Sequence, residues 1–176
     1  MKKEVFQKIK KELPEIKKNV SLKDYTTFKI GGPARYFFEA QSKEDLIKAI
    51  NAAKKIKTPF FILGRGSNVL AADEGYKGLV IKISNSKFQI LNSKIIAEAG
   101  TSLGQLVNAA ANIGLEGLEW ASGIPGTIGG AIYGNAGTKE ECIGDVVKTA
   151  EVFDVKANRV RKLSKKECKF DYRDSI

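Results

Sequence analysis

The sequence has no histidine and only two cysteines among its 176 residues. Without imidazole there is no histidine-based catalytic triad, no imidazole general base and no zinc site of the common catalytic kind. Cys142 and Cys168 form no CxxC motif and match neither a metal framework nor a disulfide scaffold. We therefore expect two reduced thiols and no bound metal.

No hydrophobic run approaches the ~20 residues that a membrane-spanning helix requires. The first residues, MKKEVFQKIKKEL, are basic, but they include glutamates and lack the apolar core of a secretory signal peptide. The composition, 43% hydrophobic and 28% charged, is typical of a globular protein. We expect a protein of the cytoplasm that does not engage a membrane.

The formal net charge of +10 is concentrated at the two ends of the chain. Residues 1–18 carry seven lysines against three glutamates, and residues 155–176 carry eight basic against three acidic residues. A diffuse basic surface attracts phosphates without selecting a sequence, and no DNA- or RNA-binding motif is present. The expected partner is therefore an anionic small molecule, with a non-catalytic binder of anions or nucleic acid as an alternative.

The first half of the chain has the hydrophobic pattern of a helix followed by a βαβ unit. Apolar residues at helical spacing predict an amphipathic helix within residues 1–18, which Pro14 ends or kinks. The elements expected next are strands at 34–40, 60–63 and 79–83 and a helix that begins at Ser42 with a sequence resembling a capping box.

After about residue 86 the pattern changes to hairpins and short helices. The expected elements are a hairpin at 88–91 and 94–99, a helix at 102–113, a second hairpin at 146–155 and 159–163, and a short helical turn opened by a capping box at 164–167. We therefore predict an α+β protein of two subdomains, residues 19–84 and 85–176, preceded by an N-terminal helix in residues 1–18.

Two glycine-rich segments are candidates for binding an anion. The first, residues 64–68 (GRGSN), follows an apolar strand, and its glycines allow a tight turn that exposes consecutive backbone N–H groups. The GxGxxG dinucleotide fingerprint would need glycine where Val69 stands, and no GxxxxGK phosphate loop occurs. Taken alone, the segment fits either a tight turn or a phosphate-binding nest.

The second glycine-rich segment covers residues 123–131 (GIPGTIGGA) and continues with GNAG at 134–137. Pro125 pre-orders a turn, and the glycines remove side chains that would keep a ligand away from the backbone. A helix beginning near Gly126 would direct its free N–H groups and the positive end of its dipole at the same place. Close packing of a helix on a sheet also selects glycine and alanine, but two such segments on adjoining subdomains would suit a ligand with two phosphates.

Four segments of the sequence form an ordered set: NVSLKDYTTFKIGG at 19–32, LGRGSNVL at 63–70, GLEWASGIPGTIGGAIYGNAG at 117–137 and FDYRDS at 170–175. In this order and spacing they resemble the UDP-N-acetylenolpyruvoylglucosamine reductase family, also called UDP-N-acetylmuramate dehydrogenase. The resemblance runs from about residue 19 to residue 176. It implies the two-subdomain FAD-binding module of the vanillyl-alcohol oxidase type.

In this family FAD lies between the two subdomains. The resemblance implies that the pyrophosphate is held by Gly64, Arg65, Gly66, Ser67 and Asn68. It implies that the other side of the flavin is lined by Ile124, Pro125, Gly126, Thr127, Gly129, Gly130 and Ala131. Because the chain has no histidine, FAD would not be histidyl-linked and would dissociate on denaturation.

The family's reaction has two halves, in which NADPH reduces FAD and the reduced flavin then reduces the enolpyruvyl ether of a UDP-sugar to give UDP-N-acetylmuramate for peptidoglycan. Arg173 matches the family's catalytic arginine, whose fork can bind a carboxylate and stabilise an enolate-like state. Tyr172 would shape the substrate and nicotinamide side of the pocket. Without the resemblance, Arg173 is an ordinary surface charge and Tyr172 a half-buried aromatic.

The chain departs from the family in two places. Family members continue into a substrate-binding domain that supplies a proton-donating serine and a glutamate, whereas this chain ends at Ile176. The resemblance therefore implies an FAD-binding part that binds FAD without completing turnover. Residues 138–142 (TKEEC) stand where many relatives have Ala-Tyr-Gly, so the role of Cys142 stays open.

A related flavin oxidase that uses molecular oxygen is the alternative enzyme.

Overall fold

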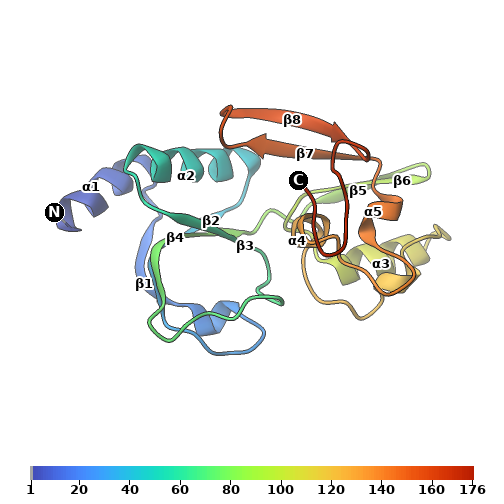
Figure 1. Cartoon of the computed structure of the whole chain (residues 1–176), viewed down its shortest axis with the longest axis horizontal. Coiled ribbons are helices and arrows are strands. Elements are labelled where there is room, and N and C mark those ends of the chain that lie inside the picture. Colours follow the sequence, from blue (N-terminus) through green and yellow to red (C-terminus); the bar gives the residue numbers. More distant parts are fainter. Residues whose placement is uncertain (1) are drawn as a thin grey trace. The chain divides into compact units, whose positions relative to one another are not determined.

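The structure is a computed structural model that describes residues 2–176. The chain divides into two compact units, Met1–Asn85 and Ser86–Ile176 (Figure 1). This division lies one residue from the boundary expected from the sequence. Among the described residues, no helix is both long enough and apolar enough to span a bilayer.

The first unit is a four-stranded mixed sheet with two helices. Its elements are α1 (Lys2–Glu12), β1 (Lys17–Ser21), the 3-10 helix η1 (Leu22–Tyr25), β2 (Pro33–Ala40), α2 (Lys43–Lys55), β3 (Phe60–Leu63) and β4 (Tyr76–Ile83). The strand order is β1-β2-β4-β3, and β2 and β3 both run parallel to β4. The predicted strand-helix-strand unit is confirmed, although β4 is inserted between the two strands that α2 connects.

The N-terminal helix is shorter than the predicted range. Helix α1 ends at Glu12, two residues before Pro14, and residues 17 and 18 already belong to β1. The prediction that Pro14 ends the helix is confirmed, and Leu13 and Ile16 are buried although they lie beyond the last helical residue. Proline cannot donate a backbone hydrogen bond and clashes with the preceding turn, which ends the helix.

Both faces of the sheet are covered. Helix α2 contacts β2 and β4, and its N-cap Ser42 accepts a hydrogen bond from the Asp45 amide at 3.0 Å. Asp45 in turn accepts from the amide of Gln41 rather than from that of Ser42, which completes the predicted capping pattern one residue earlier. The opposite face buries a cluster formed by Leu22, Ala34, Phe37, Leu63 and Val80.

The second unit combines two hairpins with short helices. Its elements are β5 (Phe88–Leu91), β6 (Lys94–Ala97), α3 (Leu103–Ala111), the 3-10 helix η2 (Glu119–Ala121), α4 (Ile128–Tyr133), α5 (Ile143–Val146), β7 (Thr149–Asp154) and β8 (Arg159–Ser164). Both predicted hairpins and the helix near 102–113 are confirmed. The main core is built by Leu103, Leu106, Val107, Ala121, Ile128, Ala131 and Ile143.

The short helical turn predicted at 164–167 is confirmed. The capping-box hydrogen bonds are present, because the Ser164 amide donates to Glu167 at 2.9 Å and the Glu167 amide donates to the Ser164 hydroxyl at 3.4 Å. The Cys168 amide donates to the Ser164 carbonyl at 3.1 Å, which closes one helical turn. Lys169 has φ +46°, so the backbone leaves the helical region before a second helical turn can form.

Candidate functional site

The GRGSN segment is a tight loop at the carboxyl end of β3. Gly66 has φ +67°, and a Cβ atom there would lie 2.1 Å from the carbonyl oxygen of Tyr25. The Gly66 carbonyl accepts a hydrogen bond from the amide of Thr27 at 3.1 Å. Gly66 is therefore required both by its backbone conformation and by close packing.

Three amides of this loop have no backbone carbonyl as partner. Within residues 2–176, outside regular helices and strands, the amides of Arg65, Gly66 and Asn68 donate to no backbone carbonyl. Arg65 and Asn68 are exposed whereas Gly66 is buried, so the open amides of this loop are those of Arg65 and Asn68. Backbone donors in a glycine-supported turn after a strand can bind a phosphate.

Besides Arg65 within the loop, Lys82 places a second positive charge near it. Lys82 pairs with Leu63 in the β3–β4 ladder, so it sits at the strand end from which the loop departs. Partial burial lowers the pKa of Lys82, the Glu39 carboxylate opposes this, and the nearby Arg65 guanidinium lowers the pKa further. The Lys82 ammonium also donates to the Ile83 carbonyl at 3.0 Å, so Lys82 adds positive charge near the loop while Glu39 partly offsets it.

The GIPGTIGGA segment forms the loop before α4 and the first turn of that helix. Gly123 has φ +81° with no heavy atom within 4 Å of an added Cβ, and Gly126 has φ +141°. Pro125 and Gly130 are exposed, and Ile124 is half-buried against the core. The open, glycine-lined part of the segment is therefore the loop at 123–126.

The expectation of free N–H groups at the start of the helix is wrong. The Ile128 amide donates to Thr101 at 2.9 Å, the Gly129 amide donates to Ala99 at 2.8 Å, and the Gly130 amide donates to the Thr127 hydroxyl at 3.3 Å. These bonds satisfy the N–H groups that open α4, so its terminus is closed by the protein itself.

Two residues of this segment serve the packing of the unit. A Cβ at Gly129 would lie 2.8 Å from that of Ala99, and Ala131 is buried in the core. The packing explanation left open by the sequence therefore holds for Gly129 and Ala131, while the loop before the helix keeps the features of a ligand site.

The FDYRDS segment forms a tight turn that presents Tyr172 and Arg173. The amides and carbonyls of Asp171 and Asp174 are paired, at 3.1 and 3.2 Å, and Arg173 between them has φ +56°. Tyr172 is 88% exposed, so the half-buried alternative is wrong in this chain. A non-glycine residue in the left-handed region is strained, and such strain is common at functional sites.

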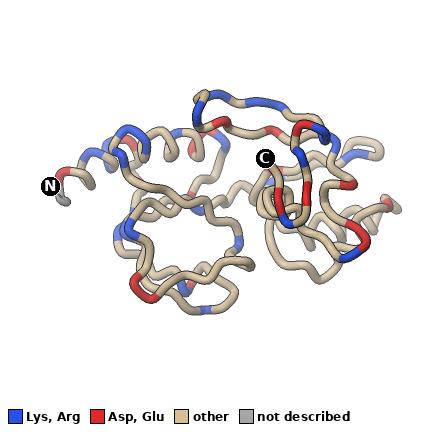
Figure 2. Tube along the Cα trace, in the orientation of Figure 1, with Lys and Arg blue, Asp and Glu red and all other residues tan. Residues whose placement is uncertain are grey.

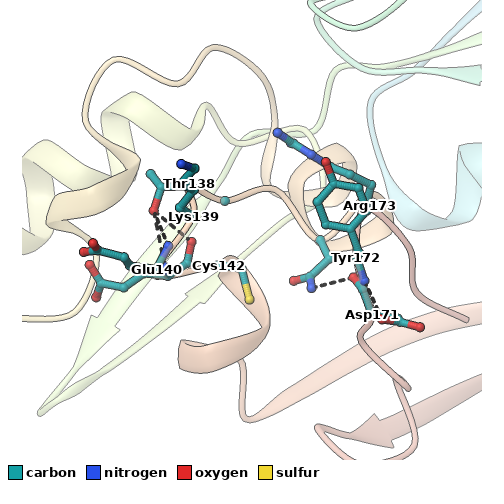
Figure 3. A pocket seen from close by; sticks show the side chains of 10 residues that line it. Thr138, Lys139, Glu140, Cys142, Asp171, Tyr172 and Arg173 are labelled. Carbon is teal, nitrogen blue, oxygen red and sulfur yellow. Dashed lines mark hydrogen bonds between the residues drawn. The ribbon is translucent and has the colours of Figure 1, made fainter.

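Arg173 borders a hollow of about 250 Å³. Figure 3 shows Tyr172 and Arg173 on one side and the loop from Thr138 to Cys142 on the other, with the Arg173 side chain pointing toward the loop. The Glu140 carboxylate points away from Arg173 in the same view. The hollow is lined by Lys139 and Arg173 and also by the acidic residues Glu140, Glu141 and Asp171. The Arg173 guanidinium is the forked donor in this lining that suits a ligand carboxylate.

The two cysteines are both free thiols. The Cys142 amide and thiol donate to the Asp145 carboxylate at 2.9 and 3.3 Å, which caps the short helix α5. Burial, and secondarily the Glu167 carboxylate, raises the pKa of Cys168. Among residues 2–176 no group of histidine, cysteine or carboxylate side chains could hold a metal ion.

The basic C-terminal region is an exposed hairpin rather than a compact patch. Figure 2 shows basic residues along β8, where Arg159, Arg161 and Lys162 are exposed. Arg161 lies 3.5 Å from the carboxylate of Asp154 on the paired strand. These charges contribute to the long-range electrostatic field of the chain.

Comparison with known proteins defines the class to which these loops belong. The chain matches the family described as FAD binding domain over residues 34–164, and it therefore belongs to that family. The p-cresol methylhydroxylase structure with bound substrate shares the fold, with a TM-score of 0.63 over 91% of this chain and 35% of that one, at 15% identity.

More specific similarity confirms the resemblance seen in the sequence. A UDP-N-acetylenolpyruvoylglucosamine reductase of Clostridium novyi is 44% identical over 92% of this chain and 53% of the relative. The crystal structure of UDP-N-acetylenolpyruvylglucosamine reductase from Thermus caldophilus matches with a TM-score of 0.77 and 37% identity, over 92% of this chain and 56% of that chain. The chain spans about half the length of the curated relatives it matches.

The residues present fit FAD. The first unit supplies open amides beside Arg65 and Lys82, which suit a diphosphate, and the second supplies glycines at 123 and 126 that let a flat ligand approach the backbone. Sequence reasoning missed Lys82, whose signal is a lysine interrupting the apolar strand LVIKI.

Proposed function

We propose that this chain binds FAD non-covalently and forms the FAD-binding part of a reductase. The proposed reaction converts UDP-N-acetylglucosamine enolpyruvate to UDP-N-acetylmuramate for peptidoglycan synthesis in the cytoplasm, with NADPH as hydride donor. The proposed partners are therefore the UDP-sugar and NADPH, without a specific nucleic acid or a membrane.

The observation that carries the FAD site is the GRGSN loop with its open amides beside two cations. In the proposed complex, Gly64, Arg65, Gly66, Ser67 and Asn68 bind the pyrophosphate through backbone N–H groups and the Arg65 guanidinium. Ile124, Pro125, Gly126, Thr127, Gly129, Gly130 and Ala131 form the second FAD-binding segment. Within that segment we expect direct contacts from the exposed loop at 123–126 and from Gly130.

FAD, when bound, supplies the hydride chemistry that no side chain of this protein can perform. Arg173 binds the carboxylate of the enolpyruvyl group through two N–H donors and stabilises the negative charge that develops on the substrate. Tyr172, exposed beside it, contacts the substrate and nicotinamide. The left-handed turn fixes the direction in which both side chains leave the backbone.

The reductase assignment is tested by extending this chain with the part of the Clostridium novyi relative that it does not match. In that joined protein, Arg173→Lys keeps the charge but loses the fork. We expect NADPH to reduce the bound flavin at the unchanged rate, and oxidation of the reduced flavin by the enolpyruvyl substrate to slow by about 10²–10³.

Stopped-flow absorbance measures the two half-reactions separately. Arg159→Ala, which removes an exposed arginine of the β7–β8 hairpin, is the control and should change neither rate. An unchanged second half-reaction in Arg173→Lys contradicts the catalytic role. A bound flavin that an alcohol or sugar reduces, and NADPH does not, favours the oxidase alternative.

A further inference from the structure

The side chain of Asn135 connects two segments of the second unit that are distant in the chain. Its Nδ2 donates to the carbonyl of Asp171 at 2.9 Å, and its Oδ1 accepts from the amide of Gly144 at 3.0 Å. The carbonyl can only accept and the amide can only donate, so the orientation of the Asn135 carboxamide is fixed. The Asn135 side chain is therefore hydrogen-bonded through its Oδ1 to α5 and through its Nδ2 to the turn that carries Tyr172 and Arg173.

The neighbourhood of Asn135 is shaped around this connection. Asn135 itself has φ +38°, a conformation that asparagine tolerates better than most residues. A Cβ at Gly144 would lie 2.9 Å from Oδ1 of Asn135 and 2.8 Å from Cγ of Phe170, so glycine leaves room for the carboxamide. The connection therefore depends on the left-handed backbone of Asn135, on the missing side chain at Gly144 and on the two hydrogen bonds of the carboxamide.

The carbonyl oxygen of Asp171, to which Asn135 donates, is also the acceptor that closes the Arg173 turn. The carbonyl of Asp171 accepts from the Asp174 amide at 3.2 Å and from Asn135, which uses both of its lone pairs. Ser175 adds a second connection, because its hydroxyl donates to the carbonyl of Tyr133 at 2.9 Å. The Ile176 amide also donates to the Cys168 carbonyl at 3.0 Å, which joins the two ends of the segment, while the Asn135 and Ser175 bonds connect the exposed turn to the α4 end.

We propose that Asn135 is a positioning residue for Arg173. Its carboxamide holds the 171–174 turn so that Arg173 keeps its left-handed backbone and its guanidinium stays at the hollow that both residues line. This inference rests on the proposed function for the role of Arg173, but the holding of the turn is a separate physical claim. A small displacement of a positioned catalytic group costs up to about 10² in rate.

Asn135→Asp separates positioning from general stability. The substituted carboxylate can still accept from Gly144, but it cannot donate to the carbonyl of Asp171. Asn158→Asp is the matched control, since Asn158 also has a left-handed backbone, at φ +51°, in the remote β7–β8 turn. Asn135→Gly, which accepts the same φ without strain and removes both bonds, covers the case in which the first variant does not fold.

The measurement is the backbone order parameter of the ¹⁵N-labelled chain. We expect the values at Tyr172 and Arg173 to fall from about 0.85 to below about 0.6 in Asn135→Asp and Asn135→Gly, while those of α4 and α5 and the affinity for FAD stay unchanged. Asn158→Asp should leave the 171–174 turn unchanged.

Two results would overturn the proposal. One is a turn that keeps its order in both Asn135 variants, and the other is a loss of order spread over the whole second unit. Wild-type chain that binds no FAD would contradict the proposed function alone, because the order of the turn is read without FAD.

Discussion

Single residues in the GRGSN loop carry the most direct consequences of the proposed FAD site. Arg65 is exposed and offers a charged donor beside open backbone amides. Since a hydrogen bond to a charged group contributes about 1.5–3 kcal/mol, Arg65→Ala should weaken FAD binding at least about tenfold. Fluorescence titration measures this, with Arg159→Ala as an exposed arginine outside the proposed site. Equal affinities for the two variants contradict the assignment of Arg65.

Substitution of glycine by alanine should have opposite effects on the unfolding free energy at Gly66 and at Gly104. Gly66→Ala must place a methyl group against the carbonyl of Tyr25 at φ +67°, so we expect a loss of about 1–3 kcal/mol in unfolding free energy. Gly104 lies in α3 with nothing within 4 Å of an added Cβ, so Gly104→Ala should stabilise the chain by about 0.5–1 kcal/mol. Urea denaturation of both variants tests the pair, and shifts in the same direction contradict the account.

Residue types and local spacing predicted which segments are candidate binding sites, but not which contacts each residue makes. Gly66 was readable as a turn glycine because strand, glycine and turn are neighbours in the chain. Lys82 and Asn135 were not, because their significance comes from partners on other elements. The left-handed conformation of Arg173 was likewise invisible, since it results from pairing of Asp171 with Asp174.

At the scale of elements, the start of α4 is stabilised by side-chain capping. Thr127 is 3% exposed, and its hydroxyl accepts from the Gly130 amide. Thr127→Val removes this acceptor and should cost about 1 kcal/mol, whereas Thr127→Ser keeps the hydroxyl and should lose less. Thermal unfolding compares the two, and a serine variant as unstable as the valine variant contradicts the capping role.

The cap of α5 predicts a response to acid. Hydrogen bonds from the Cys142 amide and then from its thiol lower the pKa of the Asp145 carboxyl, and Lys165 adds to this. Because the pKa in the folded state is lower than in the unfolded state, this stabilisation is complete above the unfolded value, near pH 4, and is lost as the pH falls through the folded value.

The acid response can be followed at a single amide. The ¹⁵N shift of Cys142 should titrate with a midpoint below the ordinary value for aspartate, and Asp145→Asn should abolish that titration. A midpoint at or above the ordinary value contradicts the cap.

The positions of helices and strands were predicted better than the hydrogen bonding at their termini. The hairpins and the parallel strand pair follow from alternating and continuous apolar runs that burial enforces. The free N–H groups expected at α4 were wrong because Thr101 and Ala99, over twenty residues earlier, supply carbonyls to them. The helical turn at 164–167 was predicted correctly from its capping box, and it stays a single turn because no apolar face follows it.

For the whole molecule, the charge of +10 predicts weak binding to nucleic acid without sequence preference. We expect double-stranded DNA to bind at low salt and to be released as salt rises toward physiological ionic strength, equally for unrelated sequences. Electrophoretic mobility shifts over a salt series measure this. A strong preference for one sequence would instead support the nucleic-acid alternative.

The central claim is that this chain, by itself, holds FAD through its glycine-rich loops. The most direct measurement is the absorbance spectrum of chain mixed with FAD and passed through a desalting column. We predict yellow protein with flavin absorbance near about 450 nm, one flavin per chain, all of it released on denaturation. Colourless protein that retains no FAD, although folded, would contradict the account.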